Sequence, residues 1–226
     1  ATIFPEYDWV KEILGDQAEN VDLTLLLGNG TDMHSFQPTM EDILKVSTCD
    51  LFIYVGGESD SWVADALKGA GNPDRKAINL MDVLGDQVKE EELVEGMQEE
   101  DGHTHEEEHT HDDDLEYDEH VWLSLKNASL FCDTIASSLA DADPEHSQLY
   151  QQNAEAYEEK LAALDQEYQT SVEKSRSKTL LFADRFPFRY LIDDYNLTYY
   201  AAFAGCSAET DALSLIHISE PTRLLS

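Results

Sequence analysis

The sequence predicts an α/β fold of two parallel-sheet lobes joined by a long rigid helix, with the second lobe truncated. Short apolar runs alternate with segments of helical period along the chain, as in parallel sheets covered by helices on both faces. One helical segment extends over roughly 30 residues, or about 45 Å, the width of a whole small domain. Strands resume after it, which favours a spine between two lobes over a helix that pairs in a coiled coil.

The first lobe is expected to contain three strands and three helices. Apolar runs predict strands over residues 21–27, 51–55 and 76–80, and glycines follow the first two. Apolar residues at steps of three or four predict helices over residues 39–48, 61–68 and 123–139. Thr39 and Asp42 form a capping-box pattern that fixes the start of the first of these helices.

The long helix is expected to begin at Asp143 and Pro144, a capping residue followed by a proline at the first helical position. Apolar and aromatic residues recur at steps of three or four from residue 149 to residue 172, without an intervening proline or glycine. After the helix, the pattern predicts strands over residues 179–182 and 198–203, with a helix over residues 186–194 between them.

These elements divide the chain into consecutive parts. Residues 1–142 form the N-terminal lobe, which includes a loop rich in histidine and acid at about 96–116, and residues 143–177 form the linking helix. Residues 178–212 begin the truncated second lobe. Residues 213–223 read LSLIHISEPTR, which is also the translation of a common sequencing adapter, so we expect residues 213–226 to be adapter read-through.

The chain is strongly acidic. Its 226 residues include 48 Asp and Glu against 14 Lys and Arg, a formal net charge of −34. Binding to nucleic acid or to an anionic membrane needs clustered Lys and Arg, so the composition speaks against both. No apolar run approaches the roughly 20 residues of a membrane span. Three cysteines without a CxxC pair do not make a disulfide framework or a thiolate zinc cage. Cations are therefore the expected partners, and we also expect the chain to be a monomer.

Nearly half of the charge lies in one insert. Residues 86–119 hold 17 acidic residues and one basic residue, and four of the eight histidines lie within nine residues of it: His103, His105, His109 and His111. Residues 103–114, which contain these histidines, have no apolar residue to bury and cannot offset their ordering entropy, so we expect nearly all of this tract to be disordered without metal. Two HxH pairs among acids are typical of a loop that gathers metal ions, and a solvated acidic linker is the alternative.

Two further histidines lie in short loops that precede helices. His34 follows the first predicted strand, at the kind of strand end where ligands of open α/β sheets bind. His120 follows two carboxylates, Asp118 and Glu119, and precedes the helix over residues 123–139. Neutral imidazole suits Zn²⁺, and nearby carboxylates can orient it, so both loops are candidates for a metal site. A surface histidine and a helix-capping region are the alternatives.

Together these segments resemble a known family. HSFQP around His34, the loop rich in histidine and acid, DEHVWLSLKNA around His120 and the long helix are similar, in this order, to the metal-binding solute-binding proteins of bacterial ABC importers, the zinc/manganese type. The resemblance covers residues 2–212. It implies a metal held between the lobes by His34 and His120, either Zn²⁺ or Mn²⁺, and delivered to a membrane permease. It also implies an extracytoplasmic protein, free in a periplasm or anchored by lipid.

The resemblance is incomplete in the second lobe. The family has a third histidine that opens a short helix there, whereas the corresponding residues 183–190 of this chain read ADRFPFRY. Arg185 cannot coordinate a metal because it stays protonated. The candidate replacement ligands are Asp184, Cys206 and Glu209, whose alternative roles are a helix-cap acid, a buried small residue and part of a turn.

Two other function classes compete with metal capture. Some members of the family that this chain resembles are described as adhesins, so surface display is an alternative to transport. A metal-dependent hydrolase needs an open coordination position and a general base, for which Glu119 beside His120 is the candidate. The sequence contains no HExxH, GxSxG or phosphate-binding loop, so we expect a binding protein and not an enzyme.

Overall fold

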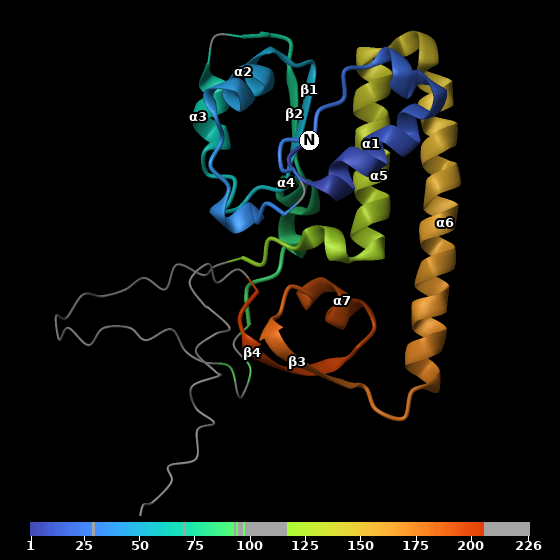
Figure 1. Cartoon of the computed structure of the whole chain (residues 1–226). Helices are drawn as coiled ribbons and strands as arrows, with labels where there is room; N and C mark the ends of the chain where they lie inside the picture. The colour runs from blue at the N-terminus through green and yellow to red at the C-terminus, as the bar shows by residue number, and fades with distance from the viewer. Residues whose placement is uncertain (29, 70, 93, 95–96, 98–116, 206–226) are drawn as a thin grey trace, which may run out of the picture.

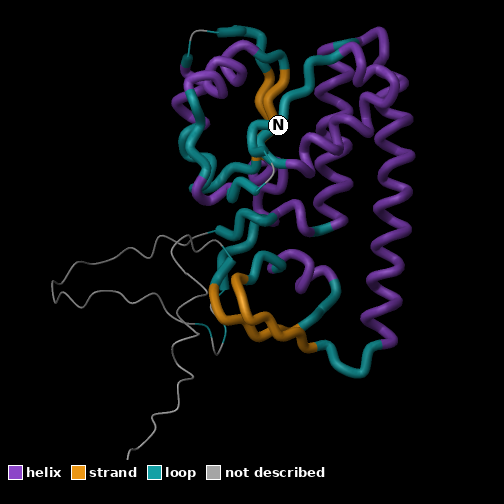
Figure 2. The backbone as a smooth tube through the Cα atoms, viewed as in Figure 1, coloured by secondary structure: helices purple, strands orange, loops and turns teal. Residues whose placement is uncertain are grey.

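Two parallel two-stranded sheets make up the strand framework of the described chain, and a long helix runs alongside both (Figure 1). The computed structural model describes residues 1–28, 30–69, 71–92, 94, 97 and 117–205. Figure 2 shows the strands in two separate places, each with helices beside it. The predicted fold class, α/β with parallel sheets and a long helix, is confirmed.

The first sheet joins β1 (Leu51–Tyr54) and β2 (Lys76–Asn79), with Leu51 opposite Lys76. Successive side chains of a strand point to opposite faces, so neighbouring residues of β1 enter different cores. Phe52 packs with residues of α2 (Met40–Thr48) and α3 (Val63–Lys68), whereas Ile53 belongs to the main core. The sheet is therefore covered on both faces, and both of its strands were predicted.

The main core lies where three helices meet: α1 (Phe4–Leu14), α5 (Leu125–Ala142) and α6 (Ser147–Lys174). Trp9 of α1 contacts Phe131 of α5, with ring centroids 5.7 Å apart. Helix α1 was not predicted from the sequence, because its apolar start looks like a strand. The buried Glu6 carboxylate accepts the backbone N–H groups of Thr2 and Ile3 at 2.8 and 3.2 Å, which stabilises this helix start.

The helix α6 confirms the predicted spine and extends over 28 residues. Its first half packs into the main core through Tyr150, Ala154 and Leu161. Its second half reaches the other lobe, where Tyr168 stacks on Tyr195 with ring centroids 5.5 Å apart. The predicted start differs in detail, because a 3₁₀ turn over Pro144–His146 precedes the helix. The side chain of Asp143 does not cap this turn; it accepts hydrogen bonds from His146 and from the hydroxyl of Tyr150.

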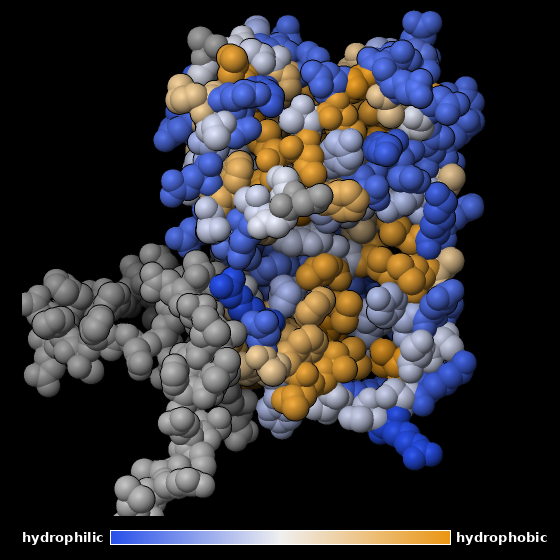
Figure 3. Space-filling model, in the orientation of Figure 1, coloured by the Kyte–Doolittle hydropathy of each residue, from blue (hydrophilic) through white to orange (hydrophobic). Residues whose placement is uncertain are grey.

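The second sheet joins β3 (Thr179–Arg185) and β4 (Thr198–Phe203) in parallel, with α7 (Arg189–Asp194) between them in the chain. All three elements were predicted, and α7 begins three residues later than expected. A small core of Phe186, Ile192, Tyr199 and Ala201 holds them together. Leu181 is 83% exposed, and Figure 3 shows hydrophobic residues gathered at the surface over this sheet.

The predicted strand over residues 21–27 is wrong. The N–H groups of Leu26 and Leu27 donate to the carbonyls of Ala1 and Thr2, both at 3.0 Å, but these residues form no ladder. Val21, at the start of this segment, is exposed, whereas a strand of a sheet covered on both faces buries its apolar residues. A short helix not predicted from the sequence, α4 (Leu80–Leu84), follows β2 directly, because Asn79 caps it. In the described part of the chain, no helix is long and apolar enough to span a membrane.

Candidate metal site

His34 is held by the aspartate two residues before it. The short 3₁₀ turn Met33–Ser35 begins after Asp32, whose Oδ1 accepts the backbone N–H of His34 at 3.0 Å. The same oxygen lies 2.9 Å from His34 Nδ1. The imidazole side chain is 9% exposed, so its orientation is fixed by the carboxylate and by its surroundings.

His120 is held in the same way. Asp118 Oδ1 accepts the backbone N–H of His120 at 2.8 Å and lies 3.0 Å from His120 Nδ1. This second pair is buried more deeply, with side chains 7% and 3% exposed for His120 and Asp118. The second lobe supports it, because the hydroxyl of Tyr190 in α7 donates to the backbone carbonyl of Asp118 at 2.9 Å.

The two Asp-x-His turns present their imidazoles to each other. The ring centroids of His34 and His120 are 5.2 Å apart, although the two residues lie 86 positions apart in the sequence. An Nδ1–H donated to a carboxylate leaves Nε2 with its lone pair, which is the form in which histidine binds metals. His34 Nε2 is buried and has no hydrogen-bond partner among the described residues. The structure thus brings together the two histidines that the sequence singled out.

Arg185 reaches across from the end of β3 to this pair. Its Nη1 lies 3.3 Å from Asp32 Oδ2, the oxygen that His34 does not use. Burial works against ionisation of Asp32, but hydrogen bonds from His34 and the charge of Arg185 outweigh it and lower the pKa of Asp32. The carboxylate that orients His34 is therefore ionised at neutral pH, and it links the two lobes.

Of the other residues predicted as ligands, only Asp184 lies in the described part of the chain. Asp184 is exposed, and its carboxylate accepts the backbone N–H of its neighbour Arg185 at 2.8 Å. Just before the described chain ends, Gly205 passes His120 so closely that a Cβ there would lie 3.4 Å from His120 Cε1. Several predicted residues lie outside the described part of the chain: Cys206, Glu209, His103, His105, His109 and His111. Within the described ranges, no three His, Cys, Asp or Glu side chains are grouped to hold a metal.

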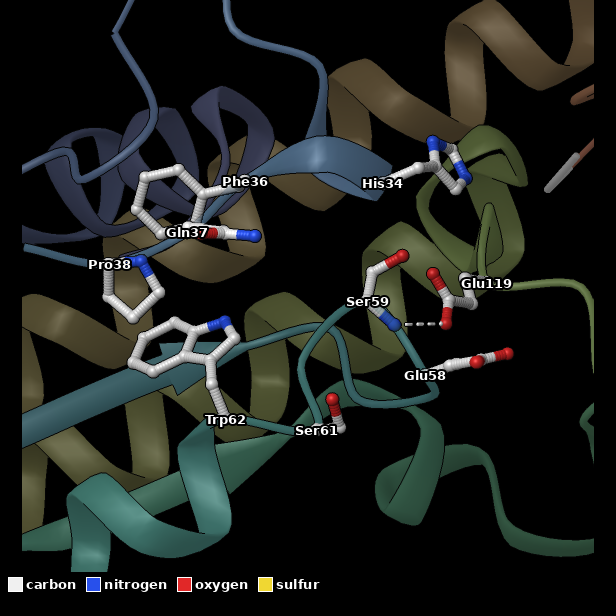
Figure 4. A pocket seen from close by; sticks show the side chains of 9 residues that line it. All are labelled: His34, Phe36, Gln37, Pro38, Glu58, Ser59, Ser61, Trp62 and Glu119. Atoms are coloured by element: carbon white, nitrogen blue, oxygen red, sulfur yellow. Dashed lines mark hydrogen bonds between the residues drawn. The ribbon is translucent and has the colours of Figure 1, made fainter. Parts of the chain in front are cut away.

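A pocket of about 370 Å³ opens beside the histidine pair (Figure 4). This pocket was not predicted from the sequence, because its walls come from three separate loops. Its lining residues are His34, Phe36, Gln37, Pro38, Glu58, Ser59, Ser61, Trp62 and Glu119. The Asp-x-His spacing, which occurs in both histidine loops, is the one signal in the sequence that marks the orienting carboxylates.

Comparison with known families decides the affiliation. The model of the ZnuA family, described as zinc-uptake complex component A, periplasmic, matches residues 1–223. The chain belongs to this family. The family is one of solute-binding components for zinc uptake and is not an enzyme family.

Individual relatives agree with the ZnuA assignment. The chain is 34% identical over 221 residues to the zinc-binding lipoprotein AdcA of Streptococcus pneumoniae, covering 97% of this chain but 41% of the relative. Among solved structures, the Zn(II)-bound ZnuA-like domain of AdcA from the same species superposes with a TM-score of 0.69 at 28% identity, covering 96% of this chain and 71% of that domain. A mutant of the laminin-binding adhesin Lmb from Streptococcus agalactiae gives 0.71 at 25% identity, with 96% and 73% covered.

Proposed function

We propose that the chain captures a divalent transition metal, Zn²⁺ in preference to Mn²⁺, between its lobes and delivers it to the permease of an ABC importer. His34 and His120 are the metal ligands in this proposal. The paired Asp-x-His turns are the observation that carries it, because each carboxylate holds an imidazole by Nδ1 and directs Nε2 to the metal. The ZnuA family model and the Zn(II)-bound neighbour support the choice of zinc.

The proposal includes a place of action and a role for the insert. The family description is periplasmic and the pneumococcal relative is a lipoprotein, which supports a site outside the cytoplasmic membrane. His103, His105, His109 and His111 gather metal ions at low affinity and raise their concentration near the tight site. The chain itself works as a monomer and catalyses no reaction. Its parts are the lobe 1–142, the linking helix 143–177 and the second lobe from 178.

Equilibrium dialysis against Zn²⁺, Mn²⁺ and Mg²⁺ in turn tests the capture step. Imidazole ligands favour Zn²⁺ over Mn²⁺, and Mg²⁺ prefers oxygen ligands and water, so tight retention is expected in that order. Retention of Mg²⁺ at the level of Zn²⁺ contradicts a histidine site. Delivery is tested with the permease and ATPase of the importer in proteoliposomes, where the zinc-loaded chain should stimulate ATP hydrolysis more than the metal-free chain.

A surface adhesin is the second candidate, because one structural neighbour is described as laminin-binding. An adhesin binds immobilised laminin whether or not an importer is present, and it does not stimulate the ATPase.

Hydrolysis, for which Glu119 is the candidate base, is tested by incubating the purified chain with ester and phosphoester substrates in the presence of Zn²⁺. Turnover that disappears when Glu119 is replaced by Gln contradicts a pure binding role.

A further inference from the structure

The pocket beside the histidine pair contains buried acceptor atoms that nothing in the described chain satisfies. His34 Nε2 and Glu119 Oε2 are both buried without a hydrogen-bond partner there, and both residues line the pocket. Glu119 as a whole is 3% exposed. In Figure 4 its free carboxylate oxygen points to the side on which His34 lies, while Trp62 stands at the other end of the pocket.

The loop after β1 is shaped around the Glu119 carboxylate. Glu119 Oε1 accepts the backbone N–H of Ser59 at 2.9 Å, which fixes one oxygen. Gly57 has φ +75°, and a Cβ there would lie 2.3 Å from Glu119 Oε1, so a side chain at this position would displace the carboxylate. The loop thus makes room for a carboxylate beside the histidine pair and leaves its second oxygen unpaired.

An unpaired buried carboxylate oxygen is unfavourable unless a donor or a cation reaches it. The pocket lining includes no lysine or arginine that could supply the charge. The charge of Glu119 also raises the pKa of its buried neighbour Asp60, in addition to the larger effect of burial. Two acceptors, an imidazole Nε2 and a carboxylate oxygen, face one hollow in an acidic environment, and a metal cation satisfies both while also balancing the carboxylate charge.

We propose that Glu119 is a further ligand of the metal, supplied by the first lobe together with His34 and His120. The inference rests on the proposed function, because it uses the same ion. Among the described residues, no three His, Cys, Asp or Glu side chains are grouped closely enough to hold a metal, so the proposal requires the Glu119 carboxylate to move toward the imidazoles when the ion enters.

The test compares Glu119→Gln with Glu58→Gln. Glu58 lines the same pocket but is exposed, so its variant is a matched control for the loss of one negative charge. Zn²⁺ affinity is measured by competition with a chromophoric chelator. We expect Glu119→Gln to bind roughly tenfold or more weakly, since even partners of the ligands typically contribute 10–100-fold. Glu58→Gln should stay within about twofold, because an exposed charge is screened by solvent.

A second readout separates coordination from structure. With Co²⁺ in place of Zn²⁺, visible absorption reports the ligand set, so the Glu119→Gln spectrum should differ from wild type whereas the Glu58→Gln spectrum should not. The metal-free melting temperatures show whether each variant folds, and Glu119→Asp, which keeps the carboxylate, should recover part of the affinity.

The outcomes distinguish the two proposals. Unchanged Zn²⁺ affinity in Glu119→Gln, or reduced affinity with an unchanged Co²⁺ spectrum, overturns the role of Glu119 as a ligand. If His34→Ala and His120→Ala bind Zn²⁺ more weakly than wild type in the same assay, the proposed function stands even though the role of Glu119 is overturned. If both histidine variants retain wild-type affinity, the proposed function fails as well.

Discussion

Each imidazole of the candidate site is oriented by one aspartate oxygen that contacts both its backbone N–H and its Nδ1. This arrangement fixes the tautomer and the direction of Nε2 before a metal arrives. The two aspartates are not equivalent, because the Asp118 side chain is 3% exposed whereas that of Asp32 is 48% exposed and shared with Arg185. Their contributions to metal affinity should therefore differ.

Replacing either aspartate by asparagine should weaken Zn²⁺ binding without removing a ligand. We expect a loss of about 10–100-fold, with Asp118→Asn at the upper end and Asp32→Asn at the lower end. Chelator competition measures both. The matched control is Asp143→Asn, since Asp143 also contacts a histidine Nδ1, that of His146 at 2.7 Å, at the start of the long helix. Equal losses in all three variants contradict the assignment.

Asp60 predicts a pH dependence of stability. It is 8% exposed and accepts the N–H of Gly56 at 3.0 Å, and burial, assisted by the charge of Glu119, raises its pKa to about 6. The folded chain thus binds this proton more tightly than the unfolded chain, whose carboxyl has an ordinary pKa of 3.8. Protonated Asp60 therefore contributes to the free energy of unfolding. This contribution is fully present below pH 3.8 and is lost as the pH rises through about 6.

Asp60→Asn removes this titration. The difference in unfolding free energy between variant and wild type should shift in favour of the variant by about 2 kcal/mol between pH 4 and pH 7. Urea unfolding of the metal-free chain at each pH measures it. A difference that stays constant across this range shows that Asp60 titrates like an exposed carboxyl.

Among the helices and strands, features set by neighbouring residues, such as helix caps, could be predicted from the sequence. Features that depend on distant residues, such as strand pairing, could not. The capping box of α2 is confirmed, with Thr39 and Asp42 exchanging hydrogen bonds, because all its parts lie within four residues. The run 21–27 has the composition of a strand, but strand formation depends on a partner that the sequence does not reveal. The start of α1 was not predicted, because its residues have the composition of a strand. Whether they form a helix depends on packing against α5 and α6, which are distant in the sequence.

The start of α5 carries both a local and a long-range role. The hydroxyl of Ser124 accepts the N–H of Asn127 at 3.2 Å as the helix cap and donates to Asp194 Oδ2 of the second lobe at 2.6 Å. Ser124→Ala should cost about 2 kcal/mol, because it loses a cap and a charged hydrogen bond. Thr39→Ala, which loses only the local capping interactions of α2, should cost about 1 kcal/mol. Chemical denaturation of both variants compares them, and equal costs mean that the contact with Asp194 contributes nothing.

At the scale of the whole molecule, the candidate site lies where polar contacts join the lobes. Lys89 pairs with Asp193, Tyr190 contacts the backbone of Asp118, and Arg185 contacts Asp32. The sequence could identify His34 and His120 and the spine α6, because these follow from local patterns. It could not identify the pocket or the reach of Arg185, since both depend on how distant loops meet.

Arg185 should tune metal affinity through its charge. A charge of +1 on the order of 10 Å from a dication in water costs about 0.8 kcal/mol, so Arg185→Gln should tighten Zn²⁺ binding roughly fourfold at low salt. The gain should shrink at high ionic strength because the charges are screened. Arg185→Lys keeps the charge and should bind like wild type. Weaker binding in Arg185→Gln would indicate that the contact with Asp32 matters more than the repulsion.

In the proposed function, His34 and His120 hold one metal ion between the lobes. Calorimetric titration of Zn²⁺ into wild type, His34→Ala, His120→Ala and the control His146→Ala tests this assignment. We predict that the tight binding step is lost in the first two variants and kept in the control, whose histidine lies at the start of the long helix. Tight binding that survives in both His34→Ala and His120→Ala would contradict the claim.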